Sequence, residues 1–328
     1  MKGNAPVVPL NLGSSAAGEL DFSREKLWDR MDPAMGQEAV SLPVYLVSPG
    51  QMDLLYPPKR RRFLDPQAVR NWARWQREAR REREEDREED PLRGLEEMTE
   101  EGYWRYQRSV AAGLYLAEPP SDGQWRGVLS QGGAPSLPKP QGPAIFLCPE
   151  RILDWADRNG ANPHLVLDKV YYHELAHALM DTGPTPYEEH WGRVVEESLA
   201  NWVAFGRFRG KEARWVQRLI EDQPAEYQGY AHLGEALWVH PQVVADFERF
   251  LWHLRHFWEE FLDWRRWARR RGLPLTVPLA MPWDPTDLTW GERGPRWVYE
   301  AWKGAKRKDI DPEFWKVYAH HLLLAAFS

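Results

Sequence analysis

The sequence predicts an α+β fold in which a small mixed sheet is followed by a mainly helical C-terminal part. Two short apolar segments, residues 42–47 and 144–148, have the length and composition of buried β-strands. After them, apolar residues recur three and four positions apart over long segments, most clearly in residues 243–271. Strand signals therefore dominate the first half of the chain and helix signals the second.

We expect three parts along the 328 residues. Residues 1–22 are rich in Gly, Pro and Asn and are predicted to form a flexible arm. Residues 23–182 are expected to form an N-terminal subdomain that contains the sheet, and residues 183–328 a helical C-terminal subdomain. Within the first subdomain, a helix over residues 66–90 carries interleaved opposite charges in its second half, so we expect it to project into solvent.

Further elements are predicted from local signals. The stretch 118–142 is rich in Pro, Gly, Ser and Gln and predicts an exposed loop, with a short strand at residues 125–129. The strand at 144–148 is expected to lie at the edge of the sheet and to border a substrate groove. Pro149 is expected to open a helix, and a last amphipathic helix is predicted over residues 312–327.

Residues 171–177 read Tyr-Tyr-His-Glu-Leu-Ala-His and contain an HExxH pattern within a predicted helix over residues 163–181. Positions four apart lie on one face of a helix, so His173 and His177 can each direct one ring nitrogen at a common point. Glu174 lies beside that face, where its carboxylate can take a proton from a metal-bound water. This combination predicts a catalytic Zn²⁺ site with Glu174 as the general base of a hydrolase.

A catalytic zinc ion takes a third protein ligand, and we expect Glu197 to supply it from the next helix. Glu197 follows His177 by twenty positions, which leaves room for one turn and an antiparallel return. Thr185, Pro186 and Glu188 predict the start of that helix as N-cap, first helical residue and capping-box partner.

Other residues are candidates for roles at the same site. Asn201 lies four positions after Glu197 and is predicted to orient a metal ligand by hydrogen bonding. Glu196 or His190 could replace Glu197 as the ligand, and Asp181 lies on the face of the motif histidines as a second-choice ligand. A chance HExxH on a buried helix, with histidines that only pack, is the alternative to a metal site.

The runs HELAHAL and EESLANWVAF resemble the gluzincin metallopeptidases, and more narrowly the ImmA/IrrE family, whose second helix reads E-x-x-A-N-x-F-A. The resemblance covers roughly residues 142–210. Val203 stands where that family has an aromatic residue, and Asn201 stands where thermolysin-like enzymes have Asp. The resemblance implies a zincin-like fold and a zinc peptidase with Glu197 as the third ligand.

A peptidase also needs a donor for the oxyanion that forms during attack on the peptide carbonyl. Tyr230 and His232 lie in a short polar segment after the second helix and are our candidates for this catalytic role. Half-buried residues with a solvated polar tip would produce the same pattern.

Composition limits the class of protein. The single cysteine, Cys148, cannot form an internal disulfide and suggests a reducing compartment. No apolar leader precedes residue 20, so we expect a cytoplasmic protein without a membrane span. The net charge of −6 gives no general attraction to nucleic acid, and no nucleic-acid partner is expected.

These observations favour a zinc-dependent metallopeptidase that acts on a peptide or protein substrate. The alternatives are a non-catalytic interaction protein on a zincin scaffold, or a regulatory peptidase specific for one protein partner. A protein partner would be expected to bind the Trp-rich helices or the charged helix over residues 66–90.

Overall fold

The structure is a computed structural model. The residues that it describes are 7–31, 33–58, 60–67, 70, 71, 74, 104–108, 110–133, 137–181, 187 and 190–230. They contain both helices and strands, which confirms the α+β class. The chain divides into two compact units, one made of residues 1–61, 107–181 and 203–220 and the other of residues 62–106, 182–202 and 221–328. The predicted subdomain boundary near residue 182 stays a prediction.

The first unit contains a four-stranded mixed sheet with the order β1-β2-β6-β5. Strands β1 (Leu10–Asn11), β2 (Val44–Leu46) and β6 (Ala144–Leu147) are parallel, and β5 (Gly113–Leu116) pairs antiparallel with β6. The strands predicted at 42–47 and 144–148 are confirmed. All residues of β2 and β6 are buried, as expected for inner strands with continuous apolar sequences.

The described residues also form eight α-helices and a second, two-stranded sheet. The α-helices are α1 (Glu25–Asp29), α2 (Pro33–Ser41), α3 (Pro49–Leu55), α6 (Asp122–Gly132), α7 (Pro149–Asn159), α8 (Pro163–Met180), α9 (His190–Phe205) and α10 (Gly210–Glu221). Two 3-10 turns, η1 (Ala17–Glu19) and η3 (Ala225–Tyr227), and a two-stranded sheet of β3 (Arg60–Leu64) and β4 (Trp104–Arg108) accompany them.

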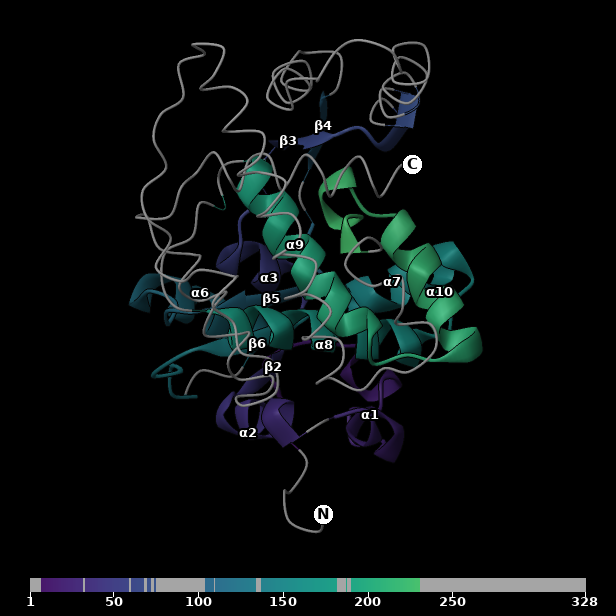
Figure 1. The fold of residues 1–328 in the computed structure, drawn as a ribbon. Coiled ribbons are helices and arrows are strands. Elements are labelled where there is room, and N and C mark those ends of the chain that lie inside the picture. The colour runs from purple at the N-terminus through teal and green to yellow at the C-terminus, as the bar shows by residue number, and fades with distance from the viewer. Residues whose placement is uncertain are drawn as a thin grey trace, which may run out of the picture. The chain divides into compact units, whose positions relative to one another are not determined.

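One buried cluster of the first unit joins the sheet to α3 and α6, which pack against each other (Figure 1). Tyr45 of β2 stacks on Phe146 of β6 with ring centroids 5.1 Å apart and meets Trp125 of α6 edge-on at 5.7 Å. The prediction of a strand at residues 125–129 is wrong, because this segment lies in α6. Trp125, Val128 and Leu129 are its buried residues, and their spacing of three and four positions is helical.

Helix α8 packs against β5, β6, α7 and α2 of the same unit (Figure 1). Its predicted start is confirmed: the Asn162 side chain accepts a hydrogen bond from the His164 backbone N–H at 2.9 Å, and Pro163 opens the helix. Tyr171 and Tyr172 are fully buried, and Tyr171 contacts Phe22 edge-on at 5.0 Å between ring centroids. The two tyrosines therefore pack the helix in place.

Residues 7–22, predicted as part of a flexible arm, belong to the fold. Strand β1 pairs with β2, and Leu12 is fully buried in the core. The carboxylate of Glu150 accepts hydrogen bonds from Ser14 Oγ at 3.0 Å and from the Ser15 backbone N–H at 2.8 Å. Composition gave no sign of these contacts, because they join residues more than 130 positions apart.

Helix α9 begins at His190 rather than at the predicted Pro186, and Tyr187 lies in a turn before it. Thr185 and Glu188, the predicted capping residues, lie outside the described residues. The start of the helix predicted over 66–90 is visible, since Asp65 Oδ1 accepts a hydrogen bond from the Gln67 backbone N–H at 2.8 Å. Beyond residue 74 that helix lies outside the described residues.

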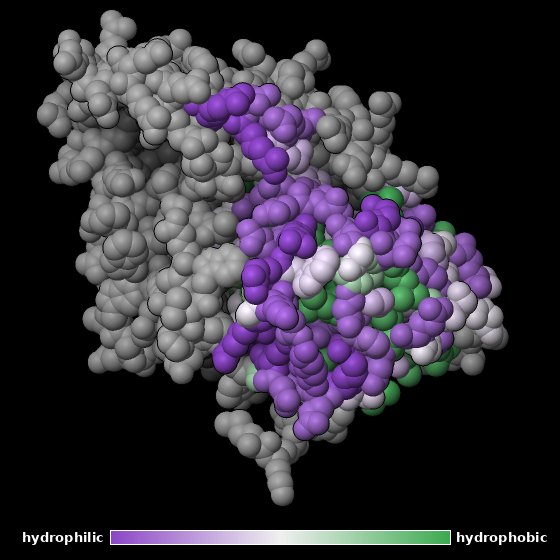
Figure 2. Space-filling model, turned by 90° about the vertical axis from the view of Figure 1, so that its right-hand side faces the viewer, coloured by the Kyte–Doolittle hydropathy of each residue, from purple (hydrophilic) through white to green (hydrophobic). Residues whose placement is uncertain are grey.

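The segments 243–271 and 312–327 also lie outside the described residues. Within the described part of the chain, no helix is long and apolar enough to cross a membrane. On the face drawn in Figure 2, the described residues are mostly hydrophilic, with a smaller group of hydrophobic residues exposed among them.

Candidate metal centre

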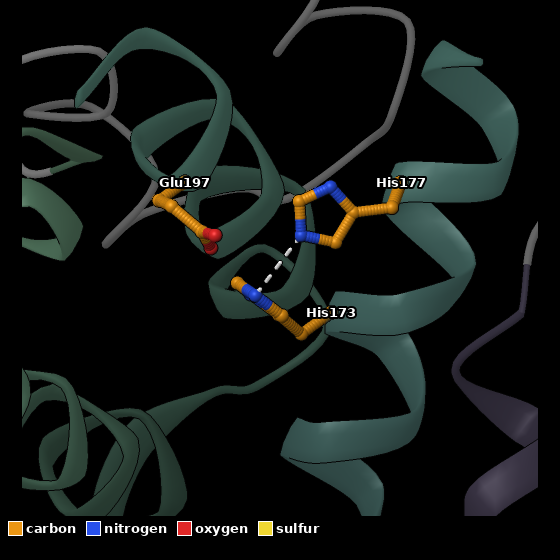
Figure 3. Close-up of side chains that lie close together, drawn as sticks. All are labelled: His173, His177 and Glu197. Atoms are coloured by element: carbon orange, nitrogen blue, oxygen red, sulfur yellow. Dashed lines mark hydrogen bonds between the residues drawn. The ribbon is translucent and has the colours of Figure 1, made fainter. Parts of the chain in front are cut away.

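Helix α8 presents His173 and His177 on one face, as the spacing of four predicts. Their Nε2 atoms lie 3.3 Å apart, and the two rings are nearly perpendicular with centroids 4.8 Å apart (Figure 3). His173 is only 6% exposed. Both imidazoles thus turn the same nitrogen towards one point instead of packing separately into the core.

The separation of these nitrogens suits a zinc ion. Two nitrogens that bind one tetrahedral zinc ion at about 2.0–2.1 Å lie about 3.3–3.4 Å apart. A direct N–H···N hydrogen bond between the rings explains the 3.3 Å separation equally well. The histidine pair by itself therefore permits a metal site but does not require one.

Glu197 of α9 completes a group that could hold a metal ion. One ligand atom from each of His173, His177 and Glu197 lies within 4.8 Å of the other two (Figure 3). Glu197 is 2% exposed, and a carboxylate buried this deeply needs a positive or hydrogen-bonding partner. Two histidines and one glutamate form a ligand set of catalytic zinc sites. The three residues therefore fit a zinc ion.

Tyr187 is a residue of this site that sequence reasoning missed. Its hydroxyl donates a hydrogen bond to Oε1 of Glu197. The Tyr187 carbonyl in turn accepts a hydrogen bond from Arg193 Nη1 at 3.2 Å. The sequence carries no signal for this contact, because Tyr187 is in a turn ten positions before Glu197 and not on its helix face.

Glu174, the predicted general base, is 7% exposed and lies against strand β5. A Cβ atom added to Gly113 of β5 would lie 2.6 Å from Glu174 Oε1, 2.8 Å from its Cγ and 2.5 Å from Val170 Cγ1. These distances are too short for real contacts, so only a glycine lets the main chain of β5 approach Glu174 this closely.

Strand β5 forms an outer edge of the four-stranded sheet in the described residues, and β6 lies between β2 and β5. The prediction that residues 144–148 form the edge strand is therefore wrong. In the register of β5 and β6, Cys148 N–H donates to the Ala112 carbonyl at 2.8 Å. Bonded and non-bonded pairs alternate along an antiparallel ladder, so the backbone N–H and C=O of Gly113 and Tyr115 point away from β6.

The competing ligands are placed as follows. Asp181 follows the last residue of α8, and its Oδ2 accepts a hydrogen bond from the Tyr115 hydroxyl at 2.7 Å. Glu196 is 9% exposed and lies outside the group of ligand atoms within 4.8 Å of one another. The side chain of His190 is not among those described. Among the described side chains, the group thus favours Glu197 as the third ligand.

Asn201, predicted to orient a ligand, donates its amide N–H to groups other than the candidate ligands. Its Nδ2 donates to the Tyr227 carbonyl at 2.9 Å and lies 3.4 Å from Gln223 Oε1. Ser198 Oγ donates to the Glu226 carbonyl at 3.3 Å. These bonds fasten α9 to the 3-10 turn η3, which is a structural task for Asn201.

Of the two predicted oxyanion donors, only Tyr230 is described. It is 5% exposed, and burial raises the pKa of its hydroxyl, so the group stays protonated at neutral pH. A protonated phenol is the form that donates a hydrogen bond. His232 lies outside the described residues, and a catalytic role for either residue stays a prediction.

Comparison of the chain with protein-family models, with curated proteins and with solved structures finds no match. The assignment of this centre therefore depends on its residues and their geometry.

Proposed function

We propose that this protein is a zinc-dependent metallopeptidase with a zincin-like arrangement related to the gluzincins of the ImmA/IrrE type. The observation that carries the proposal is the approach of His173, His177 and Glu197 to one another, with Glu174 adjacent to the first ligand on the same helix. A packing histidine pair accounts for the two imidazoles alone, whereas a shared metal ion accounts for the two imidazoles and the buried carboxylate together.

In the proposed reaction, His173, His177 and Glu197 hold the ion. When bound, zinc lowers the pKa of a coordinated water to about 7 and polarises the substrate carbonyl. Glu174 takes a proton from the attacking water and returns it to the leaving amine, so that one peptide bond and one water become a carboxylate and an amine. Tyr230 and His232 are the candidates for hydrogen bonding to the oxyanion.

The substrate in this proposal is an extended peptide segment that adds to β5. The backbone groups of Gly113 and Tyr115 point outward from the sheet, and such groups bind an added strand through main-chain hydrogen bonds. The Glu174 side chain lies close to the main chain of Gly113, so a peptide bound along this edge would pass near the general base. β5 takes the place that the sequence suggested for residues 144–148.

The proposal is tested by the variant Glu174→Gln, which keeps the size of the side chain and removes no ligand. We expect hydrolysis of an unstructured peptide library, followed by mass spectrometry, to fall on the order of 10²–10⁴-fold. Zinc content should stay at the wild-type value. Retained hydrolysis would refute the role of Glu174. A wild-type protein that binds zinc and cleaves no peptide would favour the non-catalytic scaffold.

A further inference from the structure

The environment of Glu197 suggests how the third ligand is held. Glu197 is 2% exposed, and its Oε1 accepts a hydrogen bond from the Tyr187 hydroxyl. A carboxylate has two oxygens, and this bond engages one of them. The hydrogen bond from Tyr187 therefore restricts how the Glu197 carboxylate can rotate.

Tyr187 is itself fixed by buried charged groups. Arg193, in the first turns of α9, donates from Nη1 to the Tyr187 carbonyl at 3.2 Å. Its Nη2 lies 3.8 Å from Glu226 Oε1, and both side chains of this ion pair are buried. A buried ion pair that is also hydrogen-bonded to the backbone has little freedom to rearrange. The turn that carries Tyr187 is therefore anchored to α9 and to η3.

We propose that Tyr187 is a positioning residue that orients Glu197 for metal binding, and that Arg193 and Glu226 hold Tyr187 in place. This inference rests on the proposed zinc site. Hydrogen-bond donors to metal ligands restrict the ligand to one orientation before the ion arrives, and their removal weakens metal binding on the order of 10–100-fold. Tyr187 is such a donor, because its hydroxyl donates a hydrogen bond to Oε1 of Glu197.

The chain offers a matched control for the hydroxyl of Tyr187. Tyr115 of β5 also donates from its hydroxyl to a carboxylate, Asp181, at 2.7 Å. Asp181 lies four positions after His177 and is the rival candidate ligand. Removing either hydroxyl deletes one tyrosine–carboxylate hydrogen bond, so the two variants separate the two ligand assignments.

The experiment measures Zn²⁺ affinity of the full-length protein by competition with a chromophoric chelator. We expect Tyr187→Phe to weaken Zn²⁺ binding on the order of 10–100-fold, and Tyr115→Phe to leave it unchanged. The thermal midpoint of the metal-free protein should be similar in both variants, which shows that the loss is not one of folding. Equal Zn²⁺ affinity in wild type and Tyr187→Phe would overturn the inference. A loss in Tyr115→Phe alone would overturn it in favour of Asp181.

A second variant tests the chain of contacts behind Tyr187. Glu226→Gln keeps the side-chain size and removes the charge that pairs with Arg193. We expect it to weaken Zn²⁺ binding in the wild-type background but to add little in the Tyr187→Phe background, because both changes act through the same hydroxyl. Additive losses would show that Glu226 acts independently of Tyr187. Absence of Zn²⁺ binding in the wild-type protein would instead refute the proposed function itself.

Discussion

Helices α8 and α9 supply the candidate ligands, but the sequence specifies them in different ways. α8 begins at the predicted residue because Asn162 caps it and Pro163 opens it. Its two imidazoles meet by helix geometry alone, since four positions make about one turn. α9 begins at His190, four residues later than predicted, and the turn residue Tyr187 holds its carboxylate. A ligand pair within one helix follows from spacing, whereas the third ligand depends on tertiary contacts.

The largest expected effect tests the ligand pair of α8. We expect His177→Ala to lower zinc content from about one equivalent to none, since one of three ligands is lost. His164→Ala is the control on the same helix, because His164 Nε2 accepts a hydrogen bond from the Asp21 backbone N–H at 3.2 Å and is not a candidate ligand. Elemental analysis of the purified proteins decides. Unchanged zinc in His177→Ala would exclude the site.

The next prediction concerns the approach of β5 to α8. Gly113→Ala places a methyl group within 3 Å of Glu174 and Val170, so Glu174 must move. We expect about 1–3 kcal/mol of destabilisation from overpacking, and a loss of peptide hydrolysis on the order of 10²-fold from the misplaced base. Zinc content should not change.

The control for this prediction is Gly123→Ala in α6, where an added Cβ meets nothing within 4 Å. We expect it to leave hydrolysis unchanged. A double variant that also carries Glu174→Ala should show a smaller unfolding penalty for Gly113→Ala in urea titrations. An undiminished penalty would identify Val170 as the neighbour that resists the methyl group.

A smaller effect tests the attachment of α9. Asn201→Ala removes the donor to the Tyr227 carbonyl, and the free energy of unfolding should fall by about 1–3 kcal/mol because that carbonyl loses its partner. Asn159→Ala removes a similar bond to the Trp155 carbonyl in a half-buried place on α7 and should cost less. Equal costs in urea unfolding would show that Asn201 does not anchor α9.

The smallest expected effect concerns the cap of α8. Asn162→Ala removes the acceptor for the His164 backbone N–H and should cost about 1 kcal/mol in thermal or urea unfolding. Zinc affinity should stay at the wild-type value, because the cap lies eleven positions before His173. A loss of zinc affinity would show that the ligand pair of α8 depends on more than local helix geometry.

The elements predicted correctly are those with strong local signals. The apolar strands β2 and β6 and the capped helix α8 are of this kind. Strand β5 was not predicted, because Gly-Leu-Tyr-Leu is short and its glycine argues against a strand. A glycine is needed at position 113 because Glu174 approaches the main chain there, and Glu174 lies about sixty positions away in the sequence.

The residues of the candidate site also differ in whether a local sequence signal predicts them. His173, Glu174, His177 and Glu197 were identified from spacing and from the resemblance of two short runs. Tyr187 was not, because a turn residue that contacts a carboxylate leaves no periodic pattern. The Pro, Gly and Ser residues around positions 125–129 predict an exposed loop, and a short strand within such a loop is therefore the expectation for this segment. The capping box of Ser121 and Gln124 was the signal for a helix there.

The position of β1 has a practical consequence for recombinant expression. A shortened protein that starts after residue 22 would lack β1, the strand that pairs with β2. It would also lack Leu12, which is fully buried, and its absence would leave a cavity in the core. It would also remove the Ser14 and Ser15 donors of Glu150. Burial raises the pKa of this carboxyl, and the backbone N–H of Glu150 together with these donors outweighs burial and keeps the pKa below its usual value. Purification tags should therefore be placed before residue 7, with residues 7–22 kept.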